Sequence, residues 1–204
     1  VFTNINVLGI SQFYGVRLVG SAIGSLISIT NNTISGINGG SSPMYGIYEG
    51  GGIAGSVVSG NTVQNWTGAG RIYGIAIGMD VTPASLSVNN NTIRDLTTGG
   101  LSVYGIHNAS GISTSIYKNR ICGLNANNLS GLVYGINIVN GTTTNVYNNM
   151  ITGLMAQISN VDNAVIGINV QGLAGSTANI FFNSVDLYAP GSGTIYGCSA
   201  ISAA

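Results

Sequence analysis

The stretch from Asn145 to Leu154 reads Asn-Val-Tyr-Asn-Asn-Met-Ile-Thr-Gly-Leu, and it contains the pattern that decides the fold. Asn149 has a β-branched residue three positions before it, another two positions after it, and a larger apolar residue five positions after it. The same pattern surrounds asparagines that follow one another at intervals of 28 to 34 residues: Asn32, Asn61, Asn91, Asn119, Asn149 and Asn183. A fixed interval of this length is the signature of stacked structural repeats.

The spacing around each asparagine predicts a bend in the chain. The apolar positions before and after it are separated by an odd number of residues, so one straight strand cannot turn both side chains inward. Asparagine tolerates the left-handed backbone conformation that such a bend requires. In stacked copies, amide side chains can pass hydrogen bonds from one level to the next. The sequence therefore predicts an asparagine ladder along one corner of a solenoid.

A second column consists of tyrosine or isoleucine followed by glycine, repeated at steps of 28 to 32 residues. The alternation of Tyr73, Ile75 and Ile77 is typical of a half-buried strand, with all three side chains on the core face. We expect the glycine to keep a strand face bare or a bend open. A second hypothesis makes the bare stripe a contact surface for another solenoid, formed by Gly15, Gly46, Gly74, Gly105, Gly135, Gly167 and Gly197.

Each period holds about three short strands, and no window has the apolar spacing and caps of a helix. Identical strands stacked at one period pair in parallel around a continuous core. We therefore predict an all-β fold, a right-handed parallel β-helix with six to seven rungs, as a single domain over residues 1–204. Strand patterns reach both ends of the sequence, so we expect a segment of a longer or end-to-end assembled structure.

The chain carries little charge. Charged residues make up 5% of it and the formal net charge is zero, against about 25% charged residues in typical soluble domains. Because a surface without net charge favours association, we expect the chain to bind itself. The basic residues are scattered, which argues against nucleic-acid binding. No run of 18 apolar residues occurs, which argues against a membrane-spanning helix.

Few residues could support catalysis or metal binding. The acidic residues fall on different rungs and column positions, so we expect solvated surface charges and no carboxylate pair: Glu49, Asp80, Asp95, Asp162 and Asp186. Arg94 is expected to point away from Asp95, and His107 to point outward without a catalytic partner. Cys122 and Cys198 stand about three levels apart, so we expect no disulfide, with Cys198 buried in place of an isoleucine. The sequence thus predicts no catalytic residue, metal or cofactor.

Two outward columns could bind a partner. Thr33, Thr62 and Thr92 form a hydroxyl strip that ends at Arg120, which raises an ice-binding hypothesis. The other column ends in stacked aromatic residues, which favour protein or saccharide contacts: Tyr117, Tyr147 and Phe181.

With these columns, the chain resembles the β-helical repeats of large secreted surface proteins of Bacteroidota and related bacteria. The resemblance is carried by residues 133–136, 145–154 and 179–185. It implies an extracellular or cell-surface, adhesive or scaffold role without catalytic residues. We therefore expect a non-enzymatic structural solenoid that self-associates into a fibre, sheath or surface layer. The alternatives are a polysaccharide-binding or polysaccharide-degrading β-helix and, third, an ice-binding solenoid.

Overall fold

The structure, a computed structural model, describes residues 1–7, 10–19, 26–51, 54–80, 85–172, 174–187 and 198–203. Within these residues the backbone forms strands β1 to β20 and no helix. The strands belong to three sheets, and neighbouring strands pair in parallel, about one repeat apart in the sequence. The predicted parallel β-solenoid with three strands in each rung is confirmed.

The strands of the three sheets follow one another in strict rotation along the chain. Sheet A contains β1 (Phe2–Val7), β4 (Thr33–Gly39), β7 (Thr62–Gly68), β10 (Thr92–Thr98), β13 (Arg120–Ala126), β16 (Met150–Met155) and β19 (Ser184–Asp186). Sheet B contains β2 (Phe13–Leu18), β5 (Met44–Glu49), β8 (Ile72–Ile77), β11 (Ser102–Asn108), β14 (Leu132–Ile138), β17 (Val165–Val170) and β20 (Cys198–Ala203). Sheet C contains β3 (Ser28–Thr30), β6 (Ser56–Ser59), β9 (Ser85–Asn89), β12 (Ser113–Tyr117), β15 (Thr143–Tyr147) and β18 (Thr177–Phe181).

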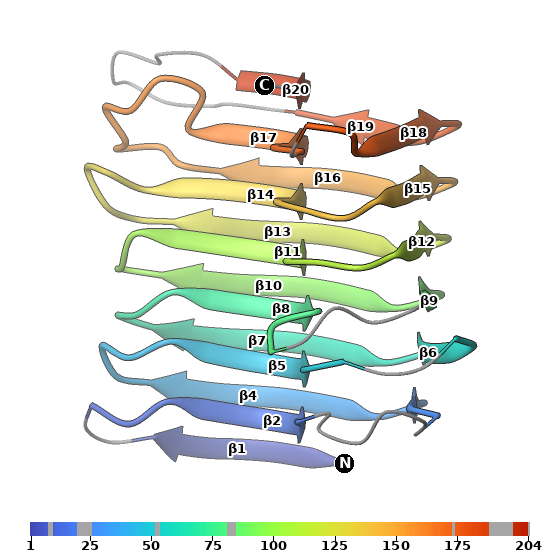
Figure 1. Cartoon of the computed structure of the whole chain (residues 1–204). Helices are drawn as coiled ribbons and strands as arrows, with labels where there is room; N and C mark the ends of the chain where they lie inside the picture. The colour runs from blue at the N-terminus through green and yellow to red at the C-terminus, as the bar shows by residue number, and fades with distance from the viewer. Residues whose placement is uncertain are drawn as a thin grey trace.

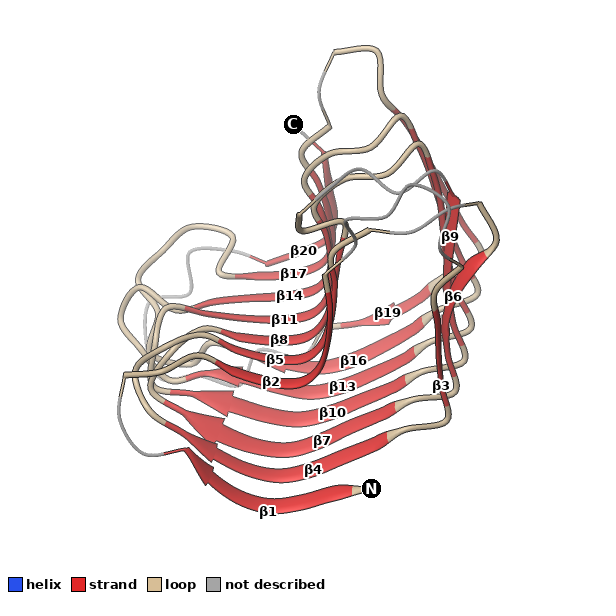
Figure 2. Ribbon diagram, turned by 60° about the horizontal axis from the view of Figure 1, so that its bottom comes forward, coloured by secondary structure: helices blue, strands red, loops and turns tan. Residues whose placement is uncertain are grey.

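The rungs stack along one axis, with the two termini at opposite ends of the stack (Figure 1). Figure 2 shows that the strands of sheet B bend midway. Their first part lies over sheet A, and their second part turns to run beside sheet C. The interior of the solenoid is therefore angular, with sheet B at the inner corner.

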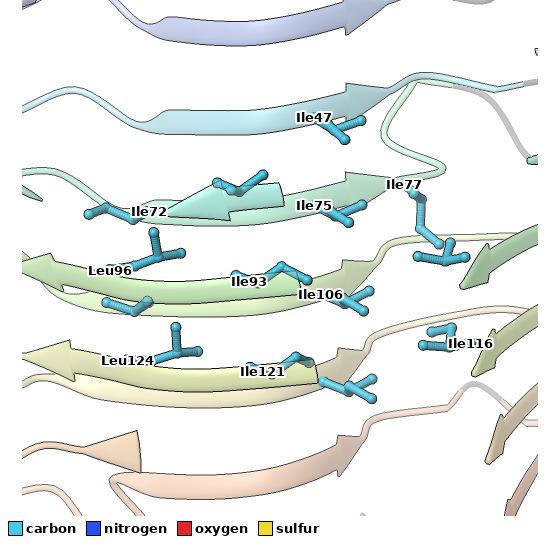
Figure 3. Close-up of a cluster of buried hydrophobic side chains, with 14 of the residues drawn as sticks. Ile47, Ile72, Ile75, Ile77, Ile93, Leu96, Ile106, Ile116, Ile121 and Leu124 are labelled. Carbon is cyan, nitrogen blue, oxygen red and sulfur yellow. The ribbon is translucent and has the colours of Figure 1, made fainter. Parts of the chain in front are cut away.

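The interior is filled by aliphatic columns, shown in Figure 3. Ile116, Ile121 and Leu124 occupy the three apolar positions around Asn119, and all are fully buried. Trp66 takes the place of leucine in its rung, where it is also fully buried and its Nε1–H donates to the carbonyl of Ile34 at 3.4 Å. The predicted core positions around the ladder asparagines are confirmed in the described rungs.

Two bends, not one, bring these columns to the same side. Positive φ occurs at the residue before each ladder asparagine, so the prediction that the asparagine itself is left-handed is wrong by one position: Asn31, Gly60, Asn90, Lys118, Asn148 and Phe182. It occurs again four residues after the ladder position, inside the strands of sheet A: Gly36, Asn65, Asp95, Gly123 and Gly153. The second bend is why apolar residues two and five positions after the asparagine both face inward.

Candidate functional surfaces

The asparagine ladder is continuous through all six predicted members. In each step the backbone N–H and the Nδ2–H of one asparagine donate to Oδ1 of the next, at 2.9–3.0 Å. From Asn61 onward, Nδ2 also donates to the carbonyl of the β-branched residue one level below, at 2.8–2.9 Å. The amides of the inner members are therefore saturated by the protein itself, and their role is structural.

The glycine column faces the interior. A Cβ added to Gly74 would lie 2.6 Å from the carbonyl oxygen of Gly105 and 2.6 Å from Cγ2 of Ile93. Equivalent close contacts with the next rung and the core surround the other described members: Gly15, Gly46, Gly105, Gly135 and Gly167. The hypothesis that this stripe is an external contact surface is therefore wrong for these residues, because their missing side chains leave room for the bend of sheet B. Gly197 lies outside the described residues.

The tyrosines beside these glycines lie on the opposite, outer face of sheet B. Their rings form a stack with centroids 4.7–5.1 Å apart: Tyr14, Tyr45, Tyr73, Tyr104 and Tyr134. The stack belongs to a cluster separate from the main core. Across the bend, the Tyr45 and Tyr48 rings meet edge to face at an interplanar angle of 87°. The expectation that Tyr73 shares a face with Ile75 is wrong, because the bend at Gly74 reverses the side.

In the last rung, the residue at the tyrosine position of sheet B is not the one that the sequence repeat predicts. Ser199 pairs with Ile166, and Cys198 pairs with Val165. Ser199 therefore takes the tyrosine position expected for Tyr196, which lies outside the described residues. Cys198 is exposed rather than buried, and both cysteines are free in this structure. The expected burial of Cys198 is therefore wrong.

Glu49 is the main departure from the expected charge distribution. It is fully buried in the inward column at the end of β5, where the next rung has Ile77. Burial raises the pKa of Glu49; backbone N–H groups of Gly78, which donates to Oε2 at 3.1 Å, and of Gly51 oppose this shift, and the Asp80 carboxylate adds to it. The expectation that Glu49 is a solvated surface charge is therefore wrong.

Asp80 occupies the outer side of the same turn. Its Oδ1 accepts a hydrogen bond from the Tyr48 hydroxyl at 2.7 Å. Burial, followed by this hydrogen bond, raises the pKa of Tyr48. Asp95 also departs from expectation: it forms an ion pair with Arg94 at 2.6 Å, and both side chains are partly exposed. A pair this exposed adds little to stability.

His107 packs among the tyrosines on the outer face of sheet B. Its ring contacts Tyr73 and Tyr104 edge to face, with centroids 5.4 and 5.2 Å away. Nδ1 lies 2.9 Å from Nδ2 of Asn137, whose Oδ1 accepts from Asn169. Nδ1 must therefore accept, which places the proton of the neutral ring on Nε2. Burial lowers the pKa of His107 to about 4.

The aromatic column on sheet C stacks as the sequence suggests. Tyr117, Tyr147 and Phe181 follow one another with centroids 4.9 and 5.0 Å apart and interplanar angles of 1°. Phe182 covers the last ring edge to face. Phe181 and Phe182 also line a recess at the end of the solenoid nearest the C-terminus. On sheet A, Thr33, Thr62 and Thr92 stand in register, with Arg120 next.

In the described part of the chain, no three His, Cys, Asp or Glu side chains gather in a way that could hold a metal ion. Over the same residues, no helix is long and apolar enough to cross a membrane. Comparison of the chain with protein-family models, curated proteins and solved structures finds no match.

Proposed function

We propose that this chain is a non-enzymatic, extracellular structural or adhesive module that associates with further copies of itself in a fibre, sheath or surface layer. The supporting observation is the apolar surface at the end of the solenoid nearest the C-terminus. A recess of about 280 Å³ lies there, lined mainly by aromatic and aliphatic side chains. Phe182 is 83% exposed and Ile201 is 52% exposed. Large exposed apolar patches of this kind mark interaction sites.

The strand register supports a second copy of the chain as the partner at this end, because the columns of the repeat can continue across it. Phe2 pairs with Ile34, so β1 at the other end has the same column positions as β19. Phe2 is itself 47% exposed. Sheets A and B can therefore continue in parallel register from β19 to β1 and from β20 to β2 of another copy. This is strand addition at a sheet edge, in which backbone hydrogen bonds give affinity and side-chain columns give register.

Sedimentation velocity over a range of concentrations tests the proposal. The wild-type chain should form larger species as concentration rises, and Ile201→Lys should shift the distribution toward the monomer, because the lysine places a charge in the contact. Leu129→Lys is the matched control, since Leu129 is 63% exposed in a loop away from this end. Equal association of all three proteins, or monomers throughout, would contradict the proposal.

Polysaccharide binding is the second candidate, and the aromatic column of sheet C is the observation that favours it. The stacked rings of Tyr117, Tyr147 and Phe181 present a line of ring edges, so contact with sugars would involve edges and hydroxyls rather than free ring faces. Affinity electrophoresis in gels containing polysaccharide tests this candidate. Retardation that Tyr147→Ala abolishes would favour it, and unchanged mobility of the wild type would contradict it.

A further inference from the structure

Two inward columns meet where the second part of sheet B runs beside sheet C. In the rung of β8 and β9 they hold Ile77 and Leu86, both buried; in Figure 3, Ile77 points toward sheet C. One level farther along, the register replaces this pair by Asn108 and Thr114. One level back, it replaces the pair by Glu49 and Ser56. At each of these two levels, the residue from sheet B and the residue from sheet C are both polar.

Polar atoms of the Asn108–Thr114 pair are not satisfied by the protein. Asn108 and Thr114 are fully buried, yet Oδ1 of Asn108 and Oγ1 of Thr114 have no hydrogen-bond partner among the described residues. The Glu49 carboxylate differs, because it accepts from the N–H groups of Gly78 and Gly51. A buried polar atom left without a partner is costly, and native structures usually supply one from the protein or from an ordered water molecule.

The Asn108 amide spans the interior from sheet B to sheet C. Its Nδ2 donates to Oγ1 of Thr144 at 3.4 Å, which brings the amide to the inner face of sheet C. Thr144 is the register neighbour of Thr114, so the amide reaches sheet C one level beyond Thr114.

The Asn108–Thr114 pair is also smaller than the pair it replaces. Asn108 and Thr114 together have one non-hydrogen side-chain atom fewer than Ile77 and Leu86. At equal sheet spacing, the volume of that atom is lined by polar groups and suits a single water molecule, whereas an apolar gap would remain dry.

We propose that the level of Asn108 and Thr114 holds one ordered internal water molecule that joins sheet B to sheet C. The water donates to Oδ1 of Asn108 and exchanges a hydrogen bond with Oγ1 of Thr114. It replaces the aliphatic contact that Ile77 and Leu86 make one level back.

The test replaces Asn108 and Thr114 by isoleucine and leucine, the residue types found at Ile77 and Leu86. In the double variant Asn108→Ile/Thr114→Leu, the oxygen-17 relaxation dispersion of water should lose the amplitude of one long-lived molecule. Thr114→Ser, which keeps the hydroxyl, should retain the wild-type amplitude. In urea unfolding, Asn108→Ile and Thr114→Leu should each lower the midpoint, and the double variant should recover most of the combined loss, because no unpaired polar atom remains.

Two results would overturn the proposal. One is the same relaxation amplitude in the wild type and the double variant. The other is a high-resolution crystal structure in which Oδ1 of Asn108 and Oγ1 of Thr114 bond directly to each other or to another protein atom.

Discussion

Asn91 shows why the ladder position admits only asparagine. Its Oδ1 accepts two hydrogen bonds from Asn61, and its Nδ2 donates to Oδ1 of Asn119 and to the carbonyl of Val58. Aspartate lacks the donors, and glutamine would carry the amide one methylene too far. One planar amide thus joins three levels of the solenoid while nearly fully buried.

We therefore expect Asn91→Ala to lower the stability of this chain more than most single substitutions do. It leaves the buried backbone N–H of Asn61 without its acceptor and removes the Nδ2 hydrogen bonds to Asn119 and to the carbonyl of Val58, which should lower the free energy of unfolding by about 3 kcal/mol. Urea unfolding measures the loss. Asn32→Ala is the control: Asn32 donates to Asn61, but it is the first described member of the ladder and more exposed. Its loss should be clearly smaller, and equal losses would argue against the ladder as the cause.

His107 gives the chain a specific sensitivity to acid. Its pKa in the folded state is about 4, below the 6.5 of the free side chain. The folded state therefore binds fewer protons, so this contribution to stability is complete above pH 6.5 and is lost as the pH falls through about 4. Between pH 7 and pH 4.5 the wild type should lose about 2 kcal/mol more than His107→Gln. Urea unfolding at both pH values checks this, and parallel losses in the two proteins would refute it.

Single residues that depart from a column were the hardest to predict. The ladder was predictable because every copy repeats the same amide in the same apolar setting. Glu49 was not, although its column also holds Leu18, Ile77 and Ile138, with Asn108 as its other polar member. Aligning every residue of the period, rather than the two most regular columns, would have placed this carboxyl in the interior. The effect of Asp80 on its pKa depends on the shape of a turn, which no repeat pattern specifies.

At the scale of the strands, each bend depends on one backbone position. Lys118 occupies the left-handed position before Asn119 with φ of 54°, where the other rungs have asparagine or glycine except at Phe182. A lysine side chain gains nothing there from local hydrogen bonding, whereas asparagine tolerates this conformation. Lys118→Asn should therefore stabilise the fold by about 1 kcal/mol. The measurement is the urea midpoint, with Lys118→Ala as the control that keeps the strain. No difference between the two variants would contradict the explanation.

The bend of sheet B should tolerate no side chain at its glycine. Gly74→Ala places a methyl group against the Gly105 carbonyl and Ile93, which should lower the free energy of unfolding by about 2 kcal/mol or more. Gly99→Ala is the matched control, because a Cβ there would meet only the Gly68 carbonyl at 3.9 Å. Thermal unfolding compares the two variants. A neutral Gly74→Ala would mean that this glycine does not face the core.

Part of this bending was present in the sequence. The apolar residues two and five positions after each asparagine are three residues apart, an odd spacing that a straight strand cannot turn to one face. That spacing signals the bend at Asp95 and its equivalents as clearly as the spacing around the asparagine signals the first bend. The bend at Gly74 carries no such signal, because Tyr73, Ile75 and Ile77 keep a regular alternation on either side of it.

At the scale of the whole molecule, the period predicted the stacking but not the cross-section. Nothing in the repeat states that sheet B turns at its middle so that its second part runs beside sheet C (Figure 2). The register of the last rung also could not be predicted from the Tyr-Gly motif. Ser199 pairs with Ile166, whereas the tyrosine of the motif is Tyr196, three residues earlier in the sequence.

Because each rung contacts only its neighbours, the two halves of the solenoid should lose stability separately. Trp66, the only tryptophan, is fully buried in β7 and reports on the first half. Leu154→Ala, in β16, removes a buried side chain three levels away in the same column, at a cost of about 2–5 kcal/mol. In urea, the circular dichroism of this variant should begin to fall before the fluorescence of Trp66 changes.

Leu96→Ala is the matched change next to the probe, because Leu96 is the register neighbour of Trp66. In that variant both signals should move to lower urea together. The comparison separates a chain of coupled rungs from an all-or-none unit. If fluorescence and circular dichroism coincide in both variants, the coupling between rungs exceeds the loss of one leucine, and the solenoid unfolds as a single cooperative structure.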